Sequence, residues 1–497
     1  MHNFNSLCRV AMNTLRVKYR GKSNATKAAL ENGFTLADDG YFYPTANILN
    51  KNQKIPDYPE TTKDVEVPLS FKSSINKTII VTSYLIGTDV PEHIWLSLTE
   101  LVVYLEAELV IIAHRYQNPT TLENSIKRIE KAEYIDPKVL PFLAWKDFSV
   151  HNHDIRCSVQ INCTTLNPLP QLKKIVTSHS IFGHSMQNMK PVPSMGEKPL
   201  VCWTTGTISD IDTARNLKAS VAQFHFKFGC IIIEPDCSSR NVHFTKSGLW
   251  TDLDAIWDGK TVKCTTSGDY KHVIWGDYHH GQTCPEALNY FTMITKRLSP
   301  DYLVLHDFID GMTVNPHATR GEQTLIWANL YQEFQSCVYE LKRLKKDIEI
   351  DILLVKSNHN DMISRYFKKT AFQDLDFQER RLLKSWLESD YSPEMMLLNE
   401  VEGTYIADDC YNVGKLRIDN HGDSGINGSK GSLEQFFSNG IIGVTGHSHT
   451  PGILGGCVAV GTMTKLRLSY NQKGASSWMN SIASVNRYGK VQSLLMF

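Results

Sequence analysis

Short apolar runs alternate along the chain with stretches that have helical spacing. In the first half, β-branched apolar residues at 78–84 and 109–113 flank a helical pattern at 91–106. A strand, a helix and a strand in this order predict a parallel sheet. Further strands are expected at 156–163, 173–177, 200–204 and 229–234. The pattern therefore predicts an α/β domain over residues 75–250.

In the second half, residues 251–497, polar side chains follow the apolar runs directly. Strands are expected at 273–275, 303–305, 350–355 and 441–444, and helices at 285–297, 320–346 and 376–388. Ligands of open α/β sheets bind outside the carboxyl ends of the strands, so the polar residues after these runs are placed to converge. We expect the chemistry of the chain to lie in this part.

The N-terminal part has a different character. A helical pattern at 6–30 ends at Asn32-Gly33, a pair suited to a left-handed helix end, so residues 1–40 are expected to form a basic helical segment. Residues 41–74 have weak periodicity, which indicates a linker or an extended arm. The basic helix could contact phosphates, although a solvated charged face is the plainer interpretation. The candidate nucleic-acid-binding residues are Arg16, Lys18, Arg20 and Lys22.

Composition is that of an ordinary globular protein. The 497 residues suffice for two or three domains, and Lys+Arg and Asp+Glu both number 52, so any polyanion must be held locally. No apolar stretch approaches the roughly 18 residues of a membrane helix, and no secretory signal is visible. The 11 cysteines lack a CxxC pair. We expect a cytoplasmic protein with reduced thiols, and we find no repeat of roughly 20 to 50 residues.

The loops after the later apolar runs offer side chains that bind metal ions. Taken singly the matches are weak, because an Asp-x-His pair is expected about once by chance in a chain of this length. A Gly-His-x-His run is much rarer, and the whole set in one order after strand-like runs strongly indicates one site. In chain order the candidates are Asp277, His279, Asp307, Asp310, Asn358, His359, His421, His447 and His449.

This series resembles the calcineurin-like metallophosphoesterase superfamily, whose pattern runs Asp-x-His, Gly-Asp-x-x-Asp, Gly-Asn-His-Asp/Glu, His and Gly-His-x-His. The resemblance covers about residues 270–497 and implies a four-layer α/β/β/α sandwich with a two-metal centre at the strand ends. It implies two sets of ligands that share the bridging carboxylate of Asp307, and a catalytic His359. One set is Asp277, His279 and His449, and the other is Asn358, His421 and His447.

Such a centre explains the choice of residue types. Two divalent ions about 3.5–4 Å apart can activate water and clamp the attacking and leaving oxygens of an in-line displacement at phosphorus. Mixed Asp, His and Asn ligands suit Mn, Fe, Zn or Ni, with Mg also allowed, and the resemblance favours manganese. His359 follows a ligand and would face the phosphate, where an imidazole can stabilise the transition state or protonate the leaving group.

The sequence departs from the family pattern at three places. His306 and Ser357 stand where the family has a glycine before a ligand. The acid that follows the catalytic histidine in the family is displaced here to Asp361. Which acid orients His359 is therefore open, and Asp310 is the alternative because its Asp-x-x-Asp spacing is intact.

The fold alone does not choose the substrate. A large α/β domain and a basic helix exceed what a small phosphatase requires, which favours DNA. The layout of the whole chain also resembles phage-encoded metallophosphoesterases with long N-terminal extensions, which implies a manganese-dependent nuclease that degrades host DNA in the bacterial cytoplasm. We therefore expect a two-metal DNA nuclease.

Two other functions stay open at this point. One is a phosphatase or phosphodiesterase for nucleotides or small esters, and the other is a DNA-binding regulatory protein with a vestigial site. Lys430 lies in a loop rich in Gly and Ser after His421, which could either contact a phosphate or be a flexible surface loop. The sequence leaves open exo or endo cleavage, the strand preference and assembly into a homo-oligomer.

Overall fold

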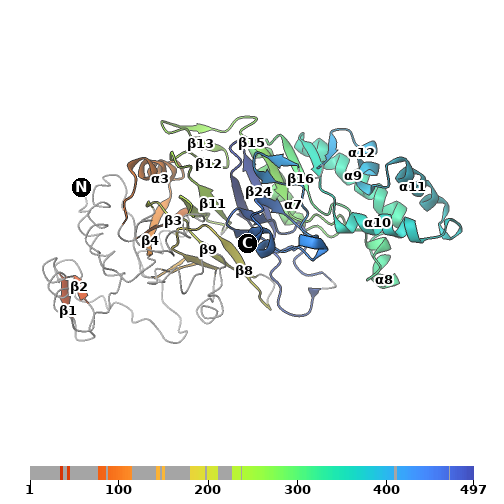
Figure 1. Cartoon of the computed structure of the whole chain (residues 1–497), viewed down its shortest axis with the longest axis horizontal. Coiled ribbons are helices and arrows are strands. Elements are labelled where there is room, and N and C mark those ends of the chain that lie inside the picture. Colours follow the sequence, from red (N-terminus) through yellow and green to blue (C-terminus); the bar gives the residue numbers. More distant parts are fainter. Residues whose placement is uncertain are drawn as a thin grey trace. The chain divides into compact units, whose positions relative to one another are not determined.

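The chain forms two compact units (Figure 1). The computed structural model describes residues 34–36, 42–44, 77–85, 88–114, 142–145, 148–151, 179–195, 199–210, 226–236, 238–407, 411–468 and 471–496. As far as these are described, unit 1 contains the residues up to Met189, Leu200–Trp250 and Trp257–Val262. Unit 2 contains Lys190–Pro199, Thr251–Ile256 and the residues from Lys263 onward. Whether either unit folds alone is a separate question, so the predicted domain limits stay predictions.

Unit 1 contains the strand, helix and strand that the apolar pattern predicts. These are β3 (Ile79–Leu85), α3 (Glu92–Tyr104) and β4 (Glu108–His114), and the two strands are parallel. All of β3 is buried, and Ile94, Leu98 and Leu101 give α3 one buried face. The parallel pairing predicted for this unit is confirmed for β3 and β4. The sheet also has antiparallel strands, because β10 (Gly229–Ile233) forms a hairpin with β11 (Ser239–His243) and pairs antiparallel with β3.

Further strands of unit 1 form a second set of pairings. They are β5 (Phe142–Trp145), β6 (Phe148–His151), β7 (His179–Phe182) and β9 (Leu200–Thr204). β5 is antiparallel to β6, whereas β6, β7 and β9 are parallel in that order. β1 (Phe34–Leu36) and β2 (Phe42–Pro44) form a separate antiparallel pair. Strands near the limits of the units are β8 (Met189–Val192), β12 (Trp250–Asp252), β13 (Ala255–Trp257) and β14 (Val262–Cys264).

Unit 2 is built on parallel strands whose carboxyl ends meet at one edge. In chain order they are β15 (Tyr270–Trp275), β16 (Tyr302–Leu305), β17 (Asp351–Leu354) and β18 (Thr404–Ile406). Each is parallel to the next. β24 (Ser481–Asn486) is antiparallel to β15, and β25 (Val491–Leu495) is antiparallel to β24. The loops that follow β15, β16 and β17 therefore lie together.

Helices follow the strands of this sheet, and all of them except the four-residue one bury apolar side chains in its core. They are α7 (Pro285–Leu298), α8 (Arg320–Gln323), α9 (Leu330–Ile348), α10 (Asn358–Lys369), α11 (Phe377–Glu388) and α12 (Pro393–Glu400). Phe291 of α7 and Phe334 of α9 share one buried core with Trp275 of β15. The Trp275 indole N–H donates to Thr295 Oγ1 at 2.9 Å, which fixes the last residue of β15 just before the polar loop.

A second sheet of unit 2 carries the later candidate ligands. Its strands are β19 (Asn412–Val413), β20 (Leu416–Arg417), β21 (Gly443–Thr445), β22 (Gly452–Leu454) and β23 (Cys457–Ala459). β20, β21 and β23 are parallel, while β19 and β22 pair antiparallel with their neighbours. The short α13 (Leu433–Ser438) and 3-10 turns at Met312–Val314, Phe372–Asp374 and Ile426–Gly428 complete the described elements.

The chain is thus a mixed α/β protein, as predicted. The expected single helix at 320–346 is wrong, because the chain leaves the helix after Gln323 and Asn329 caps a new one by accepting from the N–H of Gln332. The predicted helix at 6–30, most of the arm at 41–74 and the strands at 156–163 and 173–177 lie outside the described residues. Within the described part, no helix is long and apolar enough to cross a membrane.

Candidate metal centre

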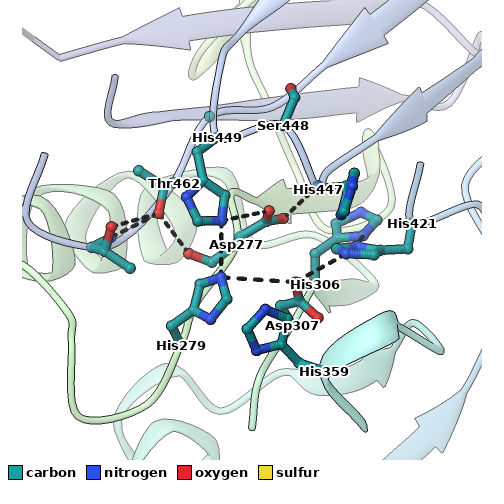
Figure 2. Close-up of polar contacts among 12 residues, drawn as sticks. Asp277, His279, His306, Asp307, His359, His421, His447, Ser448, His449 and Thr462 are labelled. Atoms are coloured by element: carbon teal, nitrogen blue, oxygen red, sulfur yellow. Dashed lines mark hydrogen bonds and ion pairs between the residues drawn. The ribbon is translucent and has the colours of Figure 1, made fainter. Parts of the chain in front are cut away.

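The predicted ligands come together from loops of both sheets of unit 2. Asp277 and His279 follow β15, and Asp307 follows β16. Asn358 begins α10, directly after the loop that follows β17. His421 lies after β20, and His447 and His449 lie after β21. Figure 2 shows the side chains of Asp277, His279, Asp307, His421 and His449 turned toward one another.

One group of donor atoms lies around Asp277. His449 Nε2 is 3.1 Å from Asp277 Oδ2 and 2.9 Å from His279 Nε2. Two nitrogens bound at right angles to one ion, each about 2.1 Å away, are themselves about 3.0 Å apart. The approach of the two imidazoles therefore matches that of two ligands of one metal ion, and these three residues form one of the clusters able to hold a metal.

A second group lies around Asn358. His421 Nε2 is 3.2 Å and His447 Nδ1 is 3.1 Å from Asn358 Oδ1. Asp307 lies between the two groups, because its Oδ2 is 3.0 Å from His421 Nε2 and 3.7 Å from His279 Nε2. One carboxylate thus faces ligand nitrogens of both groups, which is the arrangement of a bridging ligand.

The donor set fits divalent metal ions. Asp307 is 1% exposed, yet its Oδ1 has no hydrogen-bond partner among the described residues. A buried carboxylate oxygen left unpaired is costly, and a cation is the partner that offsets this cost best. Mixed carboxylate, imidazole and amide donors suit first-row metals such as Mn, Fe and Zn. Buried His and Asp groups of unit 2 could therefore hold metal, whereas the kind of metal and the number of ions are not fixed by the geometry.

The backbone is strained where these side chains converge. Residues other than glycine rarely have a positive φ, because Cβ then crowds the carbonyl oxygen at a cost of about 1–2 kcal/mol. Four candidate ligands have this conformation, with φ of 44° at His279, 43° at Asp307, 68° at His447 and 54° at His449. Strain of this kind persists where the surrounding structure fixes it, and it gathers at functional sites.

The buried acids are held as carboxylates. Burial by itself raises the pKa of Asp277, but the hydrogen bond from His449 and the charge of His421 lower it to about 2. Burial also opposes ionisation of Asp307, and the charges of His421 and His359 still hold its pKa well below the usual range. Asp277 and Asp307 are therefore both negatively charged at neutral pH.

Two histidines are held as cations in the absence of metal. Burial lowers the pKa of His279, but the hydrogen bond to Asp310 and the charge of Asp307 raise it to about 9. Burial lowers the pKa of His421 as well, and its contact with Asp307 raises it to about 9. A metal ion must displace these protons, because only neutral imidazole is a ligand.

Asp310 lies closer to the candidate ligand His279 than to His359. Its Oδ1 is 2.9 Å from His279 Nδ1 and 3.8 Å from His359 Nδ1. A carboxylate that accepts from the outer nitrogen of a histidine leaves the inner nitrogen free to bind metal. His359 Nδ1 instead donates to the main-chain carbonyl of Asp310. Its Nε2 is therefore the nitrogen that can take up or release a proton.

Ser357 and His306, which stand where the family pattern has glycine, both have structural roles. Ser357 caps α10, because its side chain accepts from the N–H of Asn360. His306 is fully buried, and its Nδ1 lies 3.3 Å from His421 Nδ1, on the side of that ring away from Asp307. Burial lowers the pKa of His306 to about 4, so a neutral His306 can accept the Nδ1 proton of His421. It therefore helps to turn His421 Nε2 toward the centre.

Of the five predicted phosphate-binding residues, the structure describes Lys430. Arg16, Lys18, Arg20 and Lys22 lie outside the described residues. Lys430 is exposed in the loop between His421 and α13, where its main chain bridges to Ser424.

Two supporting residues were missed by the sequence analysis. Thr462 Oγ1 lies 3.0 Å from the carbonyl oxygen of Asp277. Gly446 allows the two sheets to approach, since a Cβ built there would lie 2.2 Å from Asp277 Oδ1 and 3.0 Å from His306 Cγ. The Gly of the Gly-His-x-His motif was the available signal for the second of these.

We predict that Gly446→Ala disrupts the centre. The added methyl group must displace the Asp277 carboxylate, so manganese binding should weaken by about 10- to 100-fold. Titration calorimetry with manganese measures this. Gly321→Ala is the matched control, because a Cβ there meets no atom within 4 Å, and its affinity should be unchanged. Equal affinity of the Gly446→Ala protein and the wild type would contradict the close approach.

Comparison with known proteins finds one extensive similarity. No family model matches the chain, and no solved structure matches it. The chain is 23% identical over 453 residues to Protein A1 of Escherichia phage T5, an alignment that covers 81% of this chain and 78% of that protein. An alignment that covers 81% of the chain includes residues of both halves. The chain is therefore distantly similar, over most of its length, to a phage protein.

Proposed function

We propose that this chain is a two-metal phosphodiesterase of the metallophosphoesterase type that cleaves DNA. The observation that carries the proposal is the position of Asp307 between two groups of ligand atoms. A shared carboxylate between two sets of nitrogen and oxygen donors is the arrangement that holds a pair of divalent ions. When bound, the ions would supply Lewis acidity that activates water and neutralises charge on the phosphate.

The arrangement of unit 2 supports the proposed fold type. Two sheets contribute ligands, β15 to β17 from the first and β20 and β21 from the second. Helices α7 and α9 pack in the core of the first sheet. This agrees with the expected four-layer α/β/β/α sandwich, in which the centre lies where strand ends of both sheets meet.

His359 is the proposed catalytic residue. It is the second residue of α10, after the ligand Asn358, and its side chain is 19% exposed, so it can reach a substrate while anchored to the centre. The carbonyl of Asp310 accepts from Nδ1 and so fixes the tautomer. Nε2 can then donate to a phosphoryl oxygen or protonate the leaving alkoxide.

DNA is the proposed substrate for two reasons. The similarity to a phage protein covers most of the chain, which is consistent with a phage enzyme that acts in the host cytoplasm. The basic N-terminal segment and the exposed Lys430 are candidate contacts for a polyanion. Manganese is the proposed metal, and assembly into a homo-oligomer is left to measurement.

The first experiment tests the substrate. Metal-stripped protein is incubated with linear and closed-circular plasmid, a small bis-phosphodiester and a nucleoside monophosphate, with Mn, Mg, Zn or no metal. We expect plasmid to be cleaved only with metal, and cleavage of the closed circle identifies an endonuclease. Hydrolysis of the small esters beside intact plasmid would overturn the nuclease assignment. Binding of DNA without any hydrolysis would identify a regulatory protein.

A pair of variants separates metal binding from catalysis. We predict that Asp307→Ala loses metal and all activity, because the shared ligand is gone. His359→Ala should keep its metal content and lose about 10²- to 10⁴-fold in kcat, because it removes a proton donor and no ligand. Elemental analysis and single-turnover kinetics measure both. A metal-free His359→Ala protein, or an active Asp307→Ala protein, would reverse the assignment of roles.

Metal affinity should rise with pH. The pKa values of His279 and His421 are raised to about 9 without metal, so each binding event below that pH releases their protons. Manganese affinity should increase by about tenfold per pH unit for each displaced proton and level off above pH 9. By the same linkage, the two cations stabilise the metal-free fold fully below the ordinary histidine pKa of 6.5, and this stabilisation is lost as pH rises through about 9.

Calorimetric titrations with manganese at several pH values measure how steeply the affinity rises with pH. The exposed His317, which lies outside the cluster, provides the control, because His317→Ala should leave the slope unchanged. A manganese affinity that is constant from pH 6.5 to 9 would rule out bound protons on the ligand histidines.

A further inference from the structure

The strands around β3 in unit 1 and around β15 in unit 2 have the same order and the same directions. In unit 2, the hydrogen-bonded order is β16-β15-β24-β25, with α7 between the parallel strands β15 and β16. In unit 1 the order is β4-β3-β10-β11, with α3 between the parallel strands β3 and β4. Each pair in one unit has a counterpart of the same direction, and of the same order along the chain, in the other.

The second sets of pairings agree as well. In unit 2, β19 is antiparallel to β20, and β20, β21 and β23 are parallel. In unit 1, β5 is antiparallel to β6, and β6, β7 and β9 are parallel. Unrelated folds are not expected to share both the order and the directions of the strands in two sets of pairings.

A threonine marks the same position in each unit. Thr207 follows β9 and Thr462 follows β23, and each comes directly after a glycine. Thr207 Oγ1 lies 3.0 Å from the Ser83 carbonyl oxygen, and Thr462 Oγ1 lies 3.0 Å from the Asp277 carbonyl oxygen. The N–H of the residue after each threonine donates to the same carbonyl, at 2.9 Å in both units. Ser83 of unit 1 therefore occupies the place of the ligand Asp277.

A glycine and a histidine mark a second shared position. The strand register pairs Ile181 with Trp203 in unit 1 and Val444 with Val458 in unit 2. Two residues after Ile181 and Val444 the sequence reads Gly-His-Ser in both units.

The two glycines lie beside Ser83 and Asp277, the residues that the threonine contacts place at equivalent positions. A Cβ on Gly183 would lie 3.3 Å from Ser83 Cβ, and one on Gly446 would lie 2.2 Å from Asp277 Oδ1. Two independent contacts thus relate Ser83 to Asp277.

At the positions that the structure describes, unit 1 lacks most of the ligand types of unit 2 and keeps one, His184 at the place of His447. Besides Ser83 for Asp277, Leu85 stands two residues later, where unit 2 has His279, and Met186 ends the motif in place of His449. The counterpart of Asp307 on β4 is not a carboxylate. The strand register gives Ile112, and the glycine contacts, which place Ile112 where unit 2 has His306, give Ala113. Among the described residues, no element lies between β4 and β5 to match β17 and α10, which carry Asn358 and His359 in unit 2.

The strain at the ligands is absent as well. His184 and Met186, the counterparts of His447 and His449, do not have the positive φ of those ligands. His184 Nδ1 accepts from the N–H of Met186 at 2.9 Å, whereas His447 Nδ1 faces Asn358. The ring of the retained histidine is thus held by its own loop.

We infer that unit 1 is a second copy of the unit 2 fold, which has kept the scaffold of the metal centre and, at the described positions, lost the ligands Asp277, His279, Asp307 and His449. The glycine and the threonine remain because they join the two sheets, a structural task that needs no metal. The duplication rests on strand order and contacts alone. Only the assignment of all metal to unit 2 rests on the proposed function.

Matched variants of the full chain test where the metal lies. Wild-type protein, loaded with manganese and desalted, should contain about two ions per chain. His184→Ala should keep this content and the nuclease rate, whereas His447→Ala, at the equivalent position of unit 2, should lose at least one ion and most activity. Circular dichroism checks that both variants are folded. Twice the expected metal in the wild type, or loss of metal in folded His184→Ala, would overturn the inference.

An experimental structure of the full chain tests the duplication independently of metal. Superposing β3, α3, β4, β7, β9, β10 and β11 on β15, α7, β16, β21, β23, β24 and β25 should bring Ser83 onto Asp277 and Gly183 onto Gly446. Strands that cannot be superposed in this order would refute the duplication. If the wild type binds no manganese but the strands superpose, the proposed function fails and the duplication holds.

Discussion

The charge of two buried carboxylates determines which side chains unit 2 must place around them. Asp277 is 0% and Asp307 is 1% exposed, and removing such charges from water costs several kcal/mol each unless partners offset the loss. The histidines around them supply positive charge or proton donors in the metal-free protein and ligand nitrogens once metal is bound. The same side chains thus stabilise the two acids in both situations, which explains why so many imidazoles gather in one core.

Bringing these groups together requires unfavourable backbone conformations. Four candidate ligands have positive φ, and each such residue is destabilising relative to a relaxed backbone. The surrounding sheets are able to hold them because the loops are also hydrogen-bonded to each other, as in the N–H of His279 donating to the carbonyl of Asp307 at 2.8 Å. Rigid strands therefore keep the ligand geometry fixed, and ion binding would need little rearrangement.

Much of this arrangement could be predicted from the sequence, because strands leave a strong apolar signal and parallel strands place the following polar residues at one edge. Helix α10 was not predicted, because its first turn, with Asn358 and His359, is polar and its cap Ser357 stands where a glycine is expected. The role of Asp310 toward His279 could not be read from spacing, since it depends on which side chain the carboxylate faces. The match between the units was hidden because apolar strands share little beyond Gly-His-Ser and Gly-Thr, at a separation far longer than that of a common repeat.

A chain with two copies of one strand arrangement also meets a hazard while it folds. β3 and β15 each pair with one parallel and one antiparallel neighbour, and strands of multidomain proteins can pair with the wrong copy before the right one is found. Ile112, the β4 residue opposite Ser83, makes such an exchange costly, because pairing β4 with β15 would bury an apolar side chain beside the Asp277 carboxylate. The apolar residue at this position of unit 1 thus also disfavours pairing of β4 with the wrong strand.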